Sequence, residues 1–300
     1  MSSSDDAIYS DTLFTHGVVE LIDIMPVPGV GELDDAVVQM ARVSYQAGTT
    51  KKRNTEGLIN YLMAHQHWSP FEGVELKFRI RAPIFVLRQW HRHRSHSLNE
   101  ESARYSVVRD EYFLPRAVRV QDTKNKQGSL SGKLDKHDER SMIEAMEEHM
   151  QKSMELYHQL LGGVSTDQPG AAREQARIVL PQAMFSSMIW KTNLRNFFHF
   201  THLRTDTHAQ EEIRAYAHSM YEMVKPLAPL SCDAFERYMA DAVTVSGPTV
   251  AALLAYFGSE DKMRAALHDA AGGQHEKDIN RDVEKLIGYK GWREWDRRGS

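Results

Sequence analysis

The segment between residues 88 and 106 concentrates side chains that bind anions and exchange protons. It carries four arginines, three histidines, four serines and two glutamates directly after an apolar stretch. Guanidinium groups repel one another, so arginines this close together favour a phosphate or another anionic ligand among them. The arginines are Arg88, Arg92, Arg94 and Arg104. The segment is therefore predicted to form part of an anion-binding site.

Two further polar clusters, residues 65–72 and 193–206, could contribute to such a site. The second contains cationic side chains at spacings of four and three residues, which places them on one face of a helix. They are Arg195, His199 and His202. Arg177 stands in an otherwise apolar stretch, and an arginine buried there would require an anionic partner. A phosphate group would meet that requirement.

Each cluster also has a purely structural interpretation. A single arginine more often forms a salt bridge within its own chain, but four arginines with interleaved histidines favour a ligand. The nearby carboxylates are Glu100, Glu101, Asp110 and Glu111. His65 and His67 fit a packed core histidine and a turn residue better than a metal pair, because no further ligands follow at metal-site spacing. The face 195–202 fits a solvated helix surface as well as it fits a site.

Composition narrows the class of protein. Three hundred residues, of which 41% are hydrophobic, suffice for a well-buried core. A formal net charge of −4 argues against a nucleic-acid coat or a polybasic membrane binder, so the expected anion is small. The single cysteine, Cys232, excludes an internal disulfide and has no basic neighbour in sequence to activate it as a nucleophile. No signal peptide and no long apolar run is evident, so we expect a cytoplasmic protein without a membrane partner.

The strands and helices predicted around these residues are typical of an α+β fold, with a small antiparallel or mixed sheet packed against a large helical part. Period-two alternation and β-branched residues predict strands over 18–25 and 74–81. Helical spacing and flanking prolines predict helices over 34–48, 54–66, 84–93, 139–161, 169–180, 183–203 and 207–225. The last helix has Thr207 and Gln210 at capping-box spacing, and residues 121–138 read as an exposed connection.

The chain is predicted to form a main domain over residues 1–240 and a helical C-terminal extension over 241–300. The extension is marked by a change to charged, glycine-interrupted segments, with helices expected at 248–256, 260–270 and 276–287. The role of this extension does not follow from its sequence.

The run Arg92-His93-Arg94, followed seven residues later by Ser102, resembles the Arg-His-Arg-x7-Ser signature of the flavin-dependent thymidylate synthases. Several other blocks resemble that family in the same order, and together they cover about residues 16–240. They are His67-x-Ser69-Pro70-Phe71-Glu72, Ala176-Arg177-Ile178-Val179-Leu180-Pro181, Asn193-x-Arg195 and Leu203-Arg204-x-Asp206-x-His208-Ala209-Gln210-x-Glu212-Ile213.

The resemblance implies a reaction and its participants. It implies reductive methylation of dUMP to dTMP, with 5,10-methylenetetrahydrofolate as carbon donor, NADPH as reductant and FAD as cofactor. It also implies a homotetramer whose active sites combine residues of several subunits, with residues 1–240 as the catalytic domain. Two anionic ligands, a nucleotide monophosphate and the FAD pyrophosphate, would account for the arginines of an acidic chain.

Site residues follow by position from the resemblance. The FAD contacts would be Ser69, Arg92, His93, Arg94, Glu100, Asn193, Arg195 and His199. The dUMP contacts would be Gln89, Arg92, Glu100, Glu101, Ser102, Ala103, Arg104, Arg177 and Arg204. Arg204 would be catalytic, because a guanidinium beside the acidic N–H of uracil stabilises the ionised ring. Ser102 is expected to bind the nucleotide rather than attack it, and no metal is expected.

Two positions depart from the family pattern. Gly73 stands where many relatives carry histidine, and His199 stands where some carry asparagine. The FAD contacts at these two positions are therefore expected to differ in detail, and the folate site is not specified by the sequence.

Two other classes of protein fit parts of the pattern. A nucleic-acid-binding module could use residues 88–94 as a basic, aromatic-interleaved patch, but the net charge disfavours it. A metal-dependent hydrolase could use a set of histidines and a carboxylate, but their spacing disfavours it. The candidate ligands are His65, His67, His199, His202 and Asp206.

Overall fold

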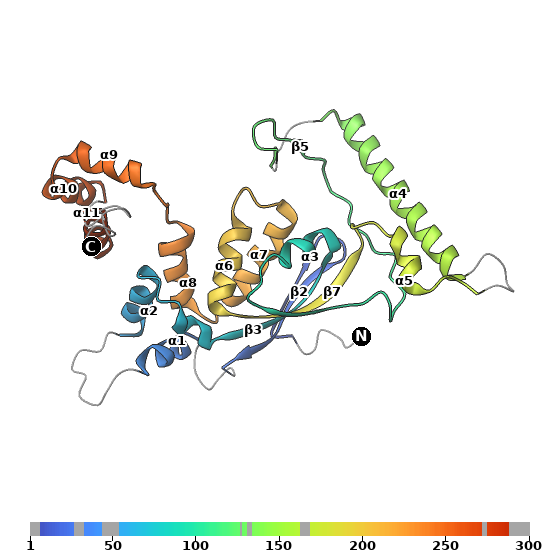
Figure 1. The fold of residues 1–300 in the computed structure, drawn as a ribbon, viewed down its shortest axis with the longest axis horizontal. Helices are drawn as coiled ribbons and strands as arrows, with labels where there is room; N and C mark the ends of the chain where they lie inside the picture. The colour runs from blue at the N-terminus through green and yellow to red at the C-terminus, as the bar shows by residue number, and fades with distance from the viewer. Residues whose placement is uncertain are drawn as a thin grey trace, which may run out of the picture. The chain divides into compact units, whose positions relative to one another are not determined.

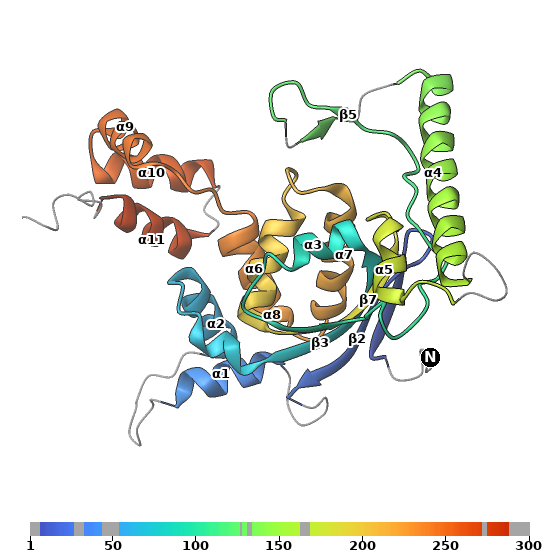
Figure 2. The same ribbon diagram turned by 45° about the vertical axis from the view of Figure 1, so that its right-hand side comes forward.

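The computed structural model describes residues 7–26, 33–43, 54–126, 128–130, 134–162, 169–271 and 275–287. The chain packs as two units, Met1–Asp241 and Ala242–Ser300 (Figures 1 and 2). No helix in the described ranges combines the length and the apolar character needed to cross a membrane.

A five-stranded sheet organises the first unit, with the strand order β1-β2-β3-β7-β4 and every neighbouring pair antiparallel. The strands are β1 Tyr9–Leu13, β2 Gly17–Met25, β3 Glu75–Pro83, β7 Phe185–Asn193 and β4 Ser97–Glu100. In β3, Leu76, Phe78 and Ile80 are fully buried, while the charged residues between them are partly exposed. This is the period-two pattern that predicted the strand. The predicted α+β class with a small antiparallel sheet is confirmed.

Helices α3, α6 and α7 pack on the sheet through aromatic side chains (Figure 2). Phe78 of β3 stacks on Phe197 of α6 with ring centroids 5.9 Å apart, and Trp90 of α3 stacks on Phe200 of α6 at 4.9 Å. Tyr216 of α7 donates a hydrogen bond to the backbone oxygen of Arg81 at 2.8 Å. The helices of this core are α1 Leu33–Arg42, α2 Thr55–Ala64, α3 Ile84–Trp90, α6 Leu194–Thr205, α7 Glu211–Val224 and α8 Pro229–Phe235, with a 3-10 helix at Ser69–Gly73 and a π-helical turn at Glu236–Ala240.

A second, smaller apolar cluster holds the long helix α4 (Lys136–Gly162) and the short helix α5 (Arg173–Ala176) against the end of β7. Its buried members are Met154, Tyr157, Ala176 and Met184. Residues 121–138, predicted as an exposed connection, contain part of a small hairpin of β5 (Val120–Gln121) and β6 (Ser129–Leu130).

The prediction of one helix over 183–203 is wrong. Residues 185–193 form strand β7, which lies between β3 and β4, and the helix begins only at Leu194. The change occurs at Asn193, whose side-chain oxygen accepts a hydrogen bond from the backbone N–H of Asn196 at 3.0 Å and so caps the start of α6. Pairing with two neighbouring strands outweighs the local helical spacing here.

Several other boundaries differ from the predicted ones. The helix predicted over 169–180 shortens to α5 and a 3-10 turn at Arg177–Val179, and α3 ends at Trp90 rather than at about residue 93. Strands β1 and β4 and helix α8 were not predicted. Residues 44–48 of the helix predicted over 34–48 lie outside the described residues.

The described residues of the second unit form three helices, α9 Gly247–Phe257, α10 Glu260–Ala270 and α11 Glu276–Ile287, at the positions that the sequence predicted. Val250, Met263 and Val283, one from each helix, are buried. Ser246 and Ser259 accept hydrogen bonds from backbone N–H groups of the first turns of α9 and α10. This unit therefore has a small apolar core of its own.

Candidate functional site

The arginine-rich segment runs from the end of α3, through a turn, into the edge strand β4. Trp90 is fully buried at the end of α3 and fixes the point at which the segment leaves the core. Arg88 lies on the last turn of α3, whereas Arg92 and Arg94 lie beyond it. The helix predicted over 84–93 includes Arg92, but α3 ends at Trp90, so Arg92 does not share a helical face with Gln89.

Arg204, near the C-terminal end of α6, joins that helix to the arginine-rich segment. Its Nε donates to Nε2 of His93 at 2.9 Å, and its Nη2 donates to the backbone oxygen of Gln89 at 3.2 Å. Two family-like blocks more than 100 residues apart therefore meet at one point. A guanidinium held by two hydrogen bonds has a fixed direction, and its remaining N–H groups can donate to a ligand.

His93 is neutral in this arrangement. Burial lowers the pKa of His93 to about 4, and the positive charge of Arg204 and the neighbouring His199 and His96 contribute to this lowering. Because Nε2 accepts the bond from Arg204, the ring proton must lie on Nδ1. The imidazole therefore acts as a hydrogen-bond acceptor that orients Arg204, and its Nδ1–H remains a donor.

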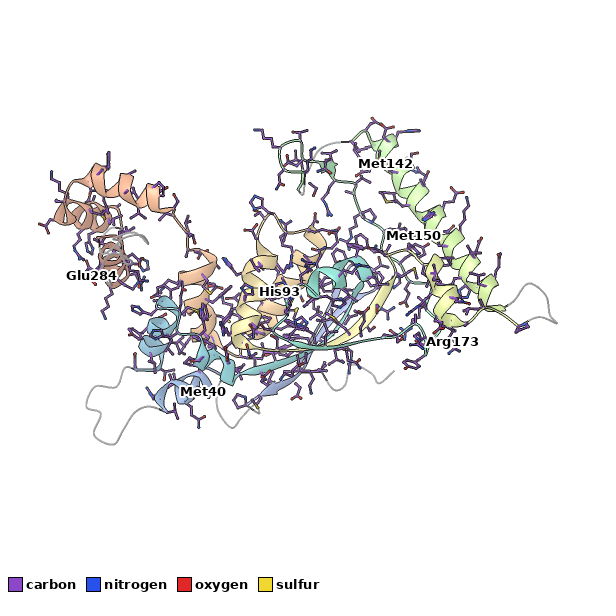
Figure 3. All side chains as sticks on the ribbon, in the orientation of Figure 1. Met40, His93, Met142, Met150, Arg173 and Glu284 are labelled. Carbon is purple, nitrogen blue, oxygen red and sulfur yellow. The ribbon has the colours of Figure 1, made fainter. Side chains whose placement is uncertain are left out.

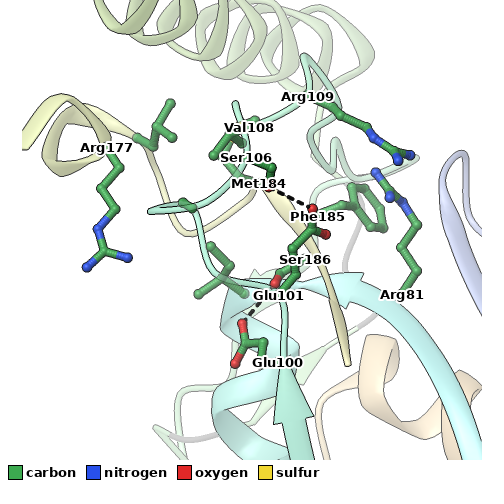
Figure 4. Close-up of a pocket in the computed structure, with 13 residues that line it drawn as sticks. Arg81, Glu100, Glu101, Ser106, Val108, Arg109, Arg177, Met184, Phe185 and Ser186 are labelled. Atoms are coloured by element: carbon green, nitrogen blue, oxygen red, sulfur yellow. Dashed lines mark hydrogen bonds between the residues drawn. The ribbon is translucent and has the colours of Figure 1, made fainter. Parts of the chain in front are cut away.

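A cavity of about 190 Å³ is lined by β4 and the segment that follows it, by the ends of β3 and β7, and by the 3-10 turn that begins at Arg177 (Figure 4). Four of the predicted dUMP contacts line it, namely Glu100, Glu101, Ala103 and Arg177. Glu100 accepts a hydrogen bond from the hydroxyl of Ser186 at 2.9 Å, which ties β4 to β7. The predicted contacts Gln89, Arg92 and Arg204 are not in the cavity lining and lie instead around the ends of α3 and α6.

Two arginines in the cavity wall were missed by the sequence reasoning. Arg81, from β3, and Arg109, from the segment after β4, lie together on the side of the cavity opposite Arg177 (Figure 4). Burial and the positive charge of Arg109 lower the pKa of Arg81, and Glu101 opposes this effect. The alternation of β3 places Arg81 on the face of the strand that points away from the core. No pattern in the sequence shows where Arg109 lies.

The carboxylates nearest in sequence to Arg88, Arg92 and Arg94 have other partners. Glu101 accepts a hydrogen bond from Ser106, Asp110 pairs with His158, and Glu111 pairs with Arg81. Within the described ranges, no hydrogen bond or ion pair to another residue is made by the side chains of Arg88, Arg92 and Arg94. Their charges therefore remain available to an anionic ligand, whereas Arg104, the fourth arginine of the segment, pairs with Glu174.

The remaining predicted nucleotide contacts lie in the exposed turn after β4. Ser102 accepts a hydrogen bond from the backbone N–H of Arg104 at 3.3 Å. Arg104 pairs with Glu174 of α5 at 3.3 Å, and Arg173 donates to the backbone oxygen of Tyr105 at 2.9 Å (Figure 3). Through these contacts, α5 holds the turn beside Arg177.

Three of the predicted FAD contacts lie on α6 or at its start, namely Asn193, Arg195 and His199. Arg195 forms an ion pair with Glu72, and the ring of His199 lies 6.0 Å from that of His93. Burial lowers the pKa of His199, as do the nearby His202 and Arg195. Ser69 begins the 3-10 helix that packs on α6, and Asn193 caps α6 while keeping its amide N–H groups for other partners.

Gly73, one of the two departures from the family pattern, lies against Met40. A Cβ atom at position 73 would overlap the Cγ of Met40, so a histidine there would require this flexible side chain to move (Figure 3). The side chain of Met40 therefore occupies space that a larger residue at position 73 would need.

Cys232, His65 and His67 are the remaining candidates for a nucleophile or for metal ligands. Cys232 is fully buried, and burial raises the pKa of its thiol to about 12, so it stays protonated. His65 and His67 lie beside Tyr61, with their rings 6.0 Å apart. Within the part of the chain that the structure describes, no three histidine, cysteine or carboxylate side chains converge to hold a metal ion.

Comparison with known proteins identifies the family. Residues 21–230 match the model of the family described as thymidylate synthase complementing protein (Thy1). A flavin-dependent thymidylate synthase of Thermus thermophilus is 40% identical over 272 residues, which cover 91% of this chain and 94% of the relative. That of Dictyostelium discoideum is 40% identical over 235 residues, covering 77% of this chain and 75% of the relative.

A solved structure also matches. The UMP/dUMP methylase PolB from Streptomyces cacaoi, bound with 5-Br dUMP, is 32% identical with a TM-score of 0.64, covering 76% of this chain and 97% of that chain. The fold is thus that of the Thy1 class of enzymes. The chain belongs to the Thy1 family and is a flavin-dependent thymidylate synthase.

The match to the Thermus relative also bears on the C-terminal extension. The part of this chain outside the match amounts to 9% of its length. That part is shorter than half of the extension over 241–300. More than half of the extension must therefore lie inside the match. The extension is shared with at least this relative.

Proposed function

We propose that this chain reductively methylates dUMP to dTMP, with 5,10-methylenetetrahydrofolate as carbon donor, NADPH as reductant and FAD as cofactor. The proposal rests on one observation: the side chains of Arg88, Arg92 and Arg94 have no partner among the described residues. They lie on the last turn of α3 and in the segment beyond it, to which Arg204 of α6 is joined by its bonds to His93 and Gln89. A nucleotide phosphate and a dinucleotide pyrophosphate are anions of the required kind.

The nucleotide is proposed to bind across the cavity and the adjoining turn. Arg177 lines the cavity, and the adjoining turn carries the hydroxyl of Ser102 and the guanidinium of Arg104, a set of groups that suits a phosphate. Glu100, Glu101 and Ala103 line the neighbouring wall. Ser102 has no base positioned to remove its proton in the contacts described, and we assign it to binding rather than to nucleophilic attack.

The residues proposed for the flavin fit an anionic dinucleotide. Arg92, Arg94 and Arg195 are cations, and Asn193 keeps its amide N–H groups as donors. In the arginine-rich segment, two residues after Arg94, the Nδ1 atom of His96 is buried and has no hydrogen-bond partner among the described residues. A buried polar atom of this kind requires a partner, and a bound ligand could supply it. When bound, FAD supplies the hydride-transfer chemistry, and the chain supplies binding and orientation.

Arg204 is proposed to act directly on the pyrimidine. His93 and the backbone of Gln89 fix the direction of its guanidinium, which leaves N–H groups to face the uracil ring. A guanidinium beside the acidic N–H of uracil stabilises the ionised ring and makes its carbon more nucleophilic. This activation needs no thiolate, which agrees with the buried and protonated state of Cys232.

The division of the predicted dUMP contacts supports a homotetramer with shared sites. One group lines the cavity and the other surrounds the ends of α3 and α6. Contacts to one nucleotide from two subunits would account for this division. Light scattering of the purified protein tests the assembly, and a monomeric mass with full activity would contradict it. A cytoplasmic location remains a prediction from the sequence.

The proposal is tested with the purified full-length protein. We expect bound flavin absorbance, NADPH oxidation that dUMP stimulates, and dTMP formation that requires the folate. UMP is assayed in parallel, because the solved relative is named a UMP/dUMP methylase. A colourless protein that takes up no FAD and forms no dTMP would refute the proposal.

A further inference from the structure

Gln210 immediately precedes α7, yet its side chain does not cap that helix. The sequence predicted a capping box of Thr207 and Gln210, but α7 begins at Glu211 and no side-chain capping bond is made at Gln210. Instead, Oε1 of Gln210 accepts a hydrogen bond from Nε2 of Gln89 at 2.6 Å. The Gln210 side chain therefore contacts a residue proposed to bind dUMP.

The start of α7 is held by other residues. Arg119 donates to Glu211 at 2.8 Å and to both carboxylate oxygens of the buried Glu212 at 2.8 and 2.9 Å. Charge-assisted bonds of this kind fix the helix start without help from Gln210. The Gln210–Gln89 bond is thus not needed to hold α7 in place.

Gln89 is held at both its backbone and its side chain. Its backbone oxygen accepts from Arg204, and its side-chain N–H donates to Gln210. A primary amide carries its donors on one side and its acceptor on the other, so while Oε1 of Gln210 faces it, the Gln89 amide turns its Nε2 towards Gln210. Without that acceptor, both orientations of the Gln89 amide become accessible.

We propose that Gln210 is a positioning residue for nucleotide binding, which acts by fixing the orientation of the Gln89 amide. The inference rests on the proposed function, because it assumes that Gln89 contacts dUMP. Gln210 itself need not touch the nucleotide. It ensures that Gln89 presents one defined arrangement of donor and acceptor to the ligand.

The test is a double-mutant cycle of Gln210→Leu and Gln89→Leu in the flavin-loaded enzyme, with KM for dUMP and kcat measured for each variant. We expect Gln210→Leu to raise KM about two- to tenfold, the equivalent of one hydrogen bond, with kcat nearly unchanged. In the Gln89→Leu background, Gln210→Leu should have no further effect. Gln210→Glu keeps an oxygen acceptor and should recover most of the affinity.

A matched control is Gln39→Leu, which makes the same change on the exposed surface of α1. It should leave KM unchanged. Multiplicative effects of the two substitutions, or an unchanged KM in Gln210→Leu, would overturn the inference. If Gln210→Leu does not fold, Gln210→Ala replaces it in both backgrounds. A wild-type enzyme that does not methylate dUMP would overturn the proposed function instead, so the two failures are distinguishable.

Discussion

The neutral state of His93 predicts a specific loss of stability in acid. In the folded chain, burial and the charge of Arg204 hold the pKa of His93 at about 4, against an ordinary value of 6.5. Between these values the unfolded chain binds a proton that the folded chain does not bind. The free energy of unfolding must therefore fall as the pH drops from 6.5 towards 4, and this contribution is constant below that range.

The size of this effect follows from the gap between the two pKa values. Fully realised, the gap corresponds to about 3 kcal/mol. The ring of His93 is partly open to water, so screening reduces the contribution, and we expect about 1–2 kcal/mol. Most of the loss should lie between pH about 6 and about 4.5.

Replacing His93 by glutamine isolates this contribution. Glutamine does not titrate, and its side-chain oxygen can still accept the hydrogen bond from Nε of Arg204. Wild type and His93→Gln are unfolded with urea, with tryptophan fluorescence as the signal, across the same pH series. The pKa values of His96 and His199 are also lowered, and both residues are present in both proteins, so their contributions cancel.

The two proteins should differ in pH dependence. The wild type should lose about 1–2 kcal/mol more than His93→Gln between neutral pH and about pH 4.5. Parallel curves would show that His93 titrates normally in the folded chain. In that case its ring could be protonated near neutral pH, and the orientation of Arg204 by a neutral imidazole would be wrong.

Four further perturbations test other parts of the structure. Arg204→Lys keeps the charge but not the paired bonds, so dTMP formation should fall at least about tenfold while flavin absorbance is retained; unchanged turnover would remove its proposed role. Cys232→Ala should retain turnover and lose about 1 kcal/mol of stability by urea unfolding, whereas lost turnover with intact folding would implicate the thiol. Glu212→Gln weakens a buried pair with Arg119 and should cost about 2 kcal/mol in the same assay, and a stability change near zero would contradict this. Removal of residues 242–300 should leave flavin binding and turnover intact, and loss of either would give the extension a role in the site.

The sequence predicted those strands and helices whose own residues alternate or repeat in the pattern of the element. β3 alternates between partly exposed and buried residues from Glu75 to Ala82, and helices α9 and α10 carry their own serine caps. β7 was missed because Ser186 and Ser187 interrupt its alternation while Met184 and Met188 repeat at helical spacing. Its strand conformation depends on pairing with β3, whose residues are about a hundred positions away in the chain.

The same distinction applies to the site. The signature residues and the α6 cations could be named from motifs, because their spacing along the chain is the signal. Arg81 and Arg109 could not, because they meet only through the path of β3 and the turn after β4. The Gln89–Gln210 bond joins residues 121 positions apart, and no periodicity in the sequence reports such a contact.

Asn193 gives the proposed flavin site a thermodynamic link to local unfolding. Its side-chain oxygen accepts from both the backbone and the side chain of Asn196, which fixes the first turn of α6 and leaves its N–H groups for a ligand. A ligand that binds those N–H groups stabilises the capped state by mass action. Loading the enzyme with cofactor should therefore slow amide hydrogen exchange in the first turn of α6, and fraying of that turn should in turn weaken cofactor binding.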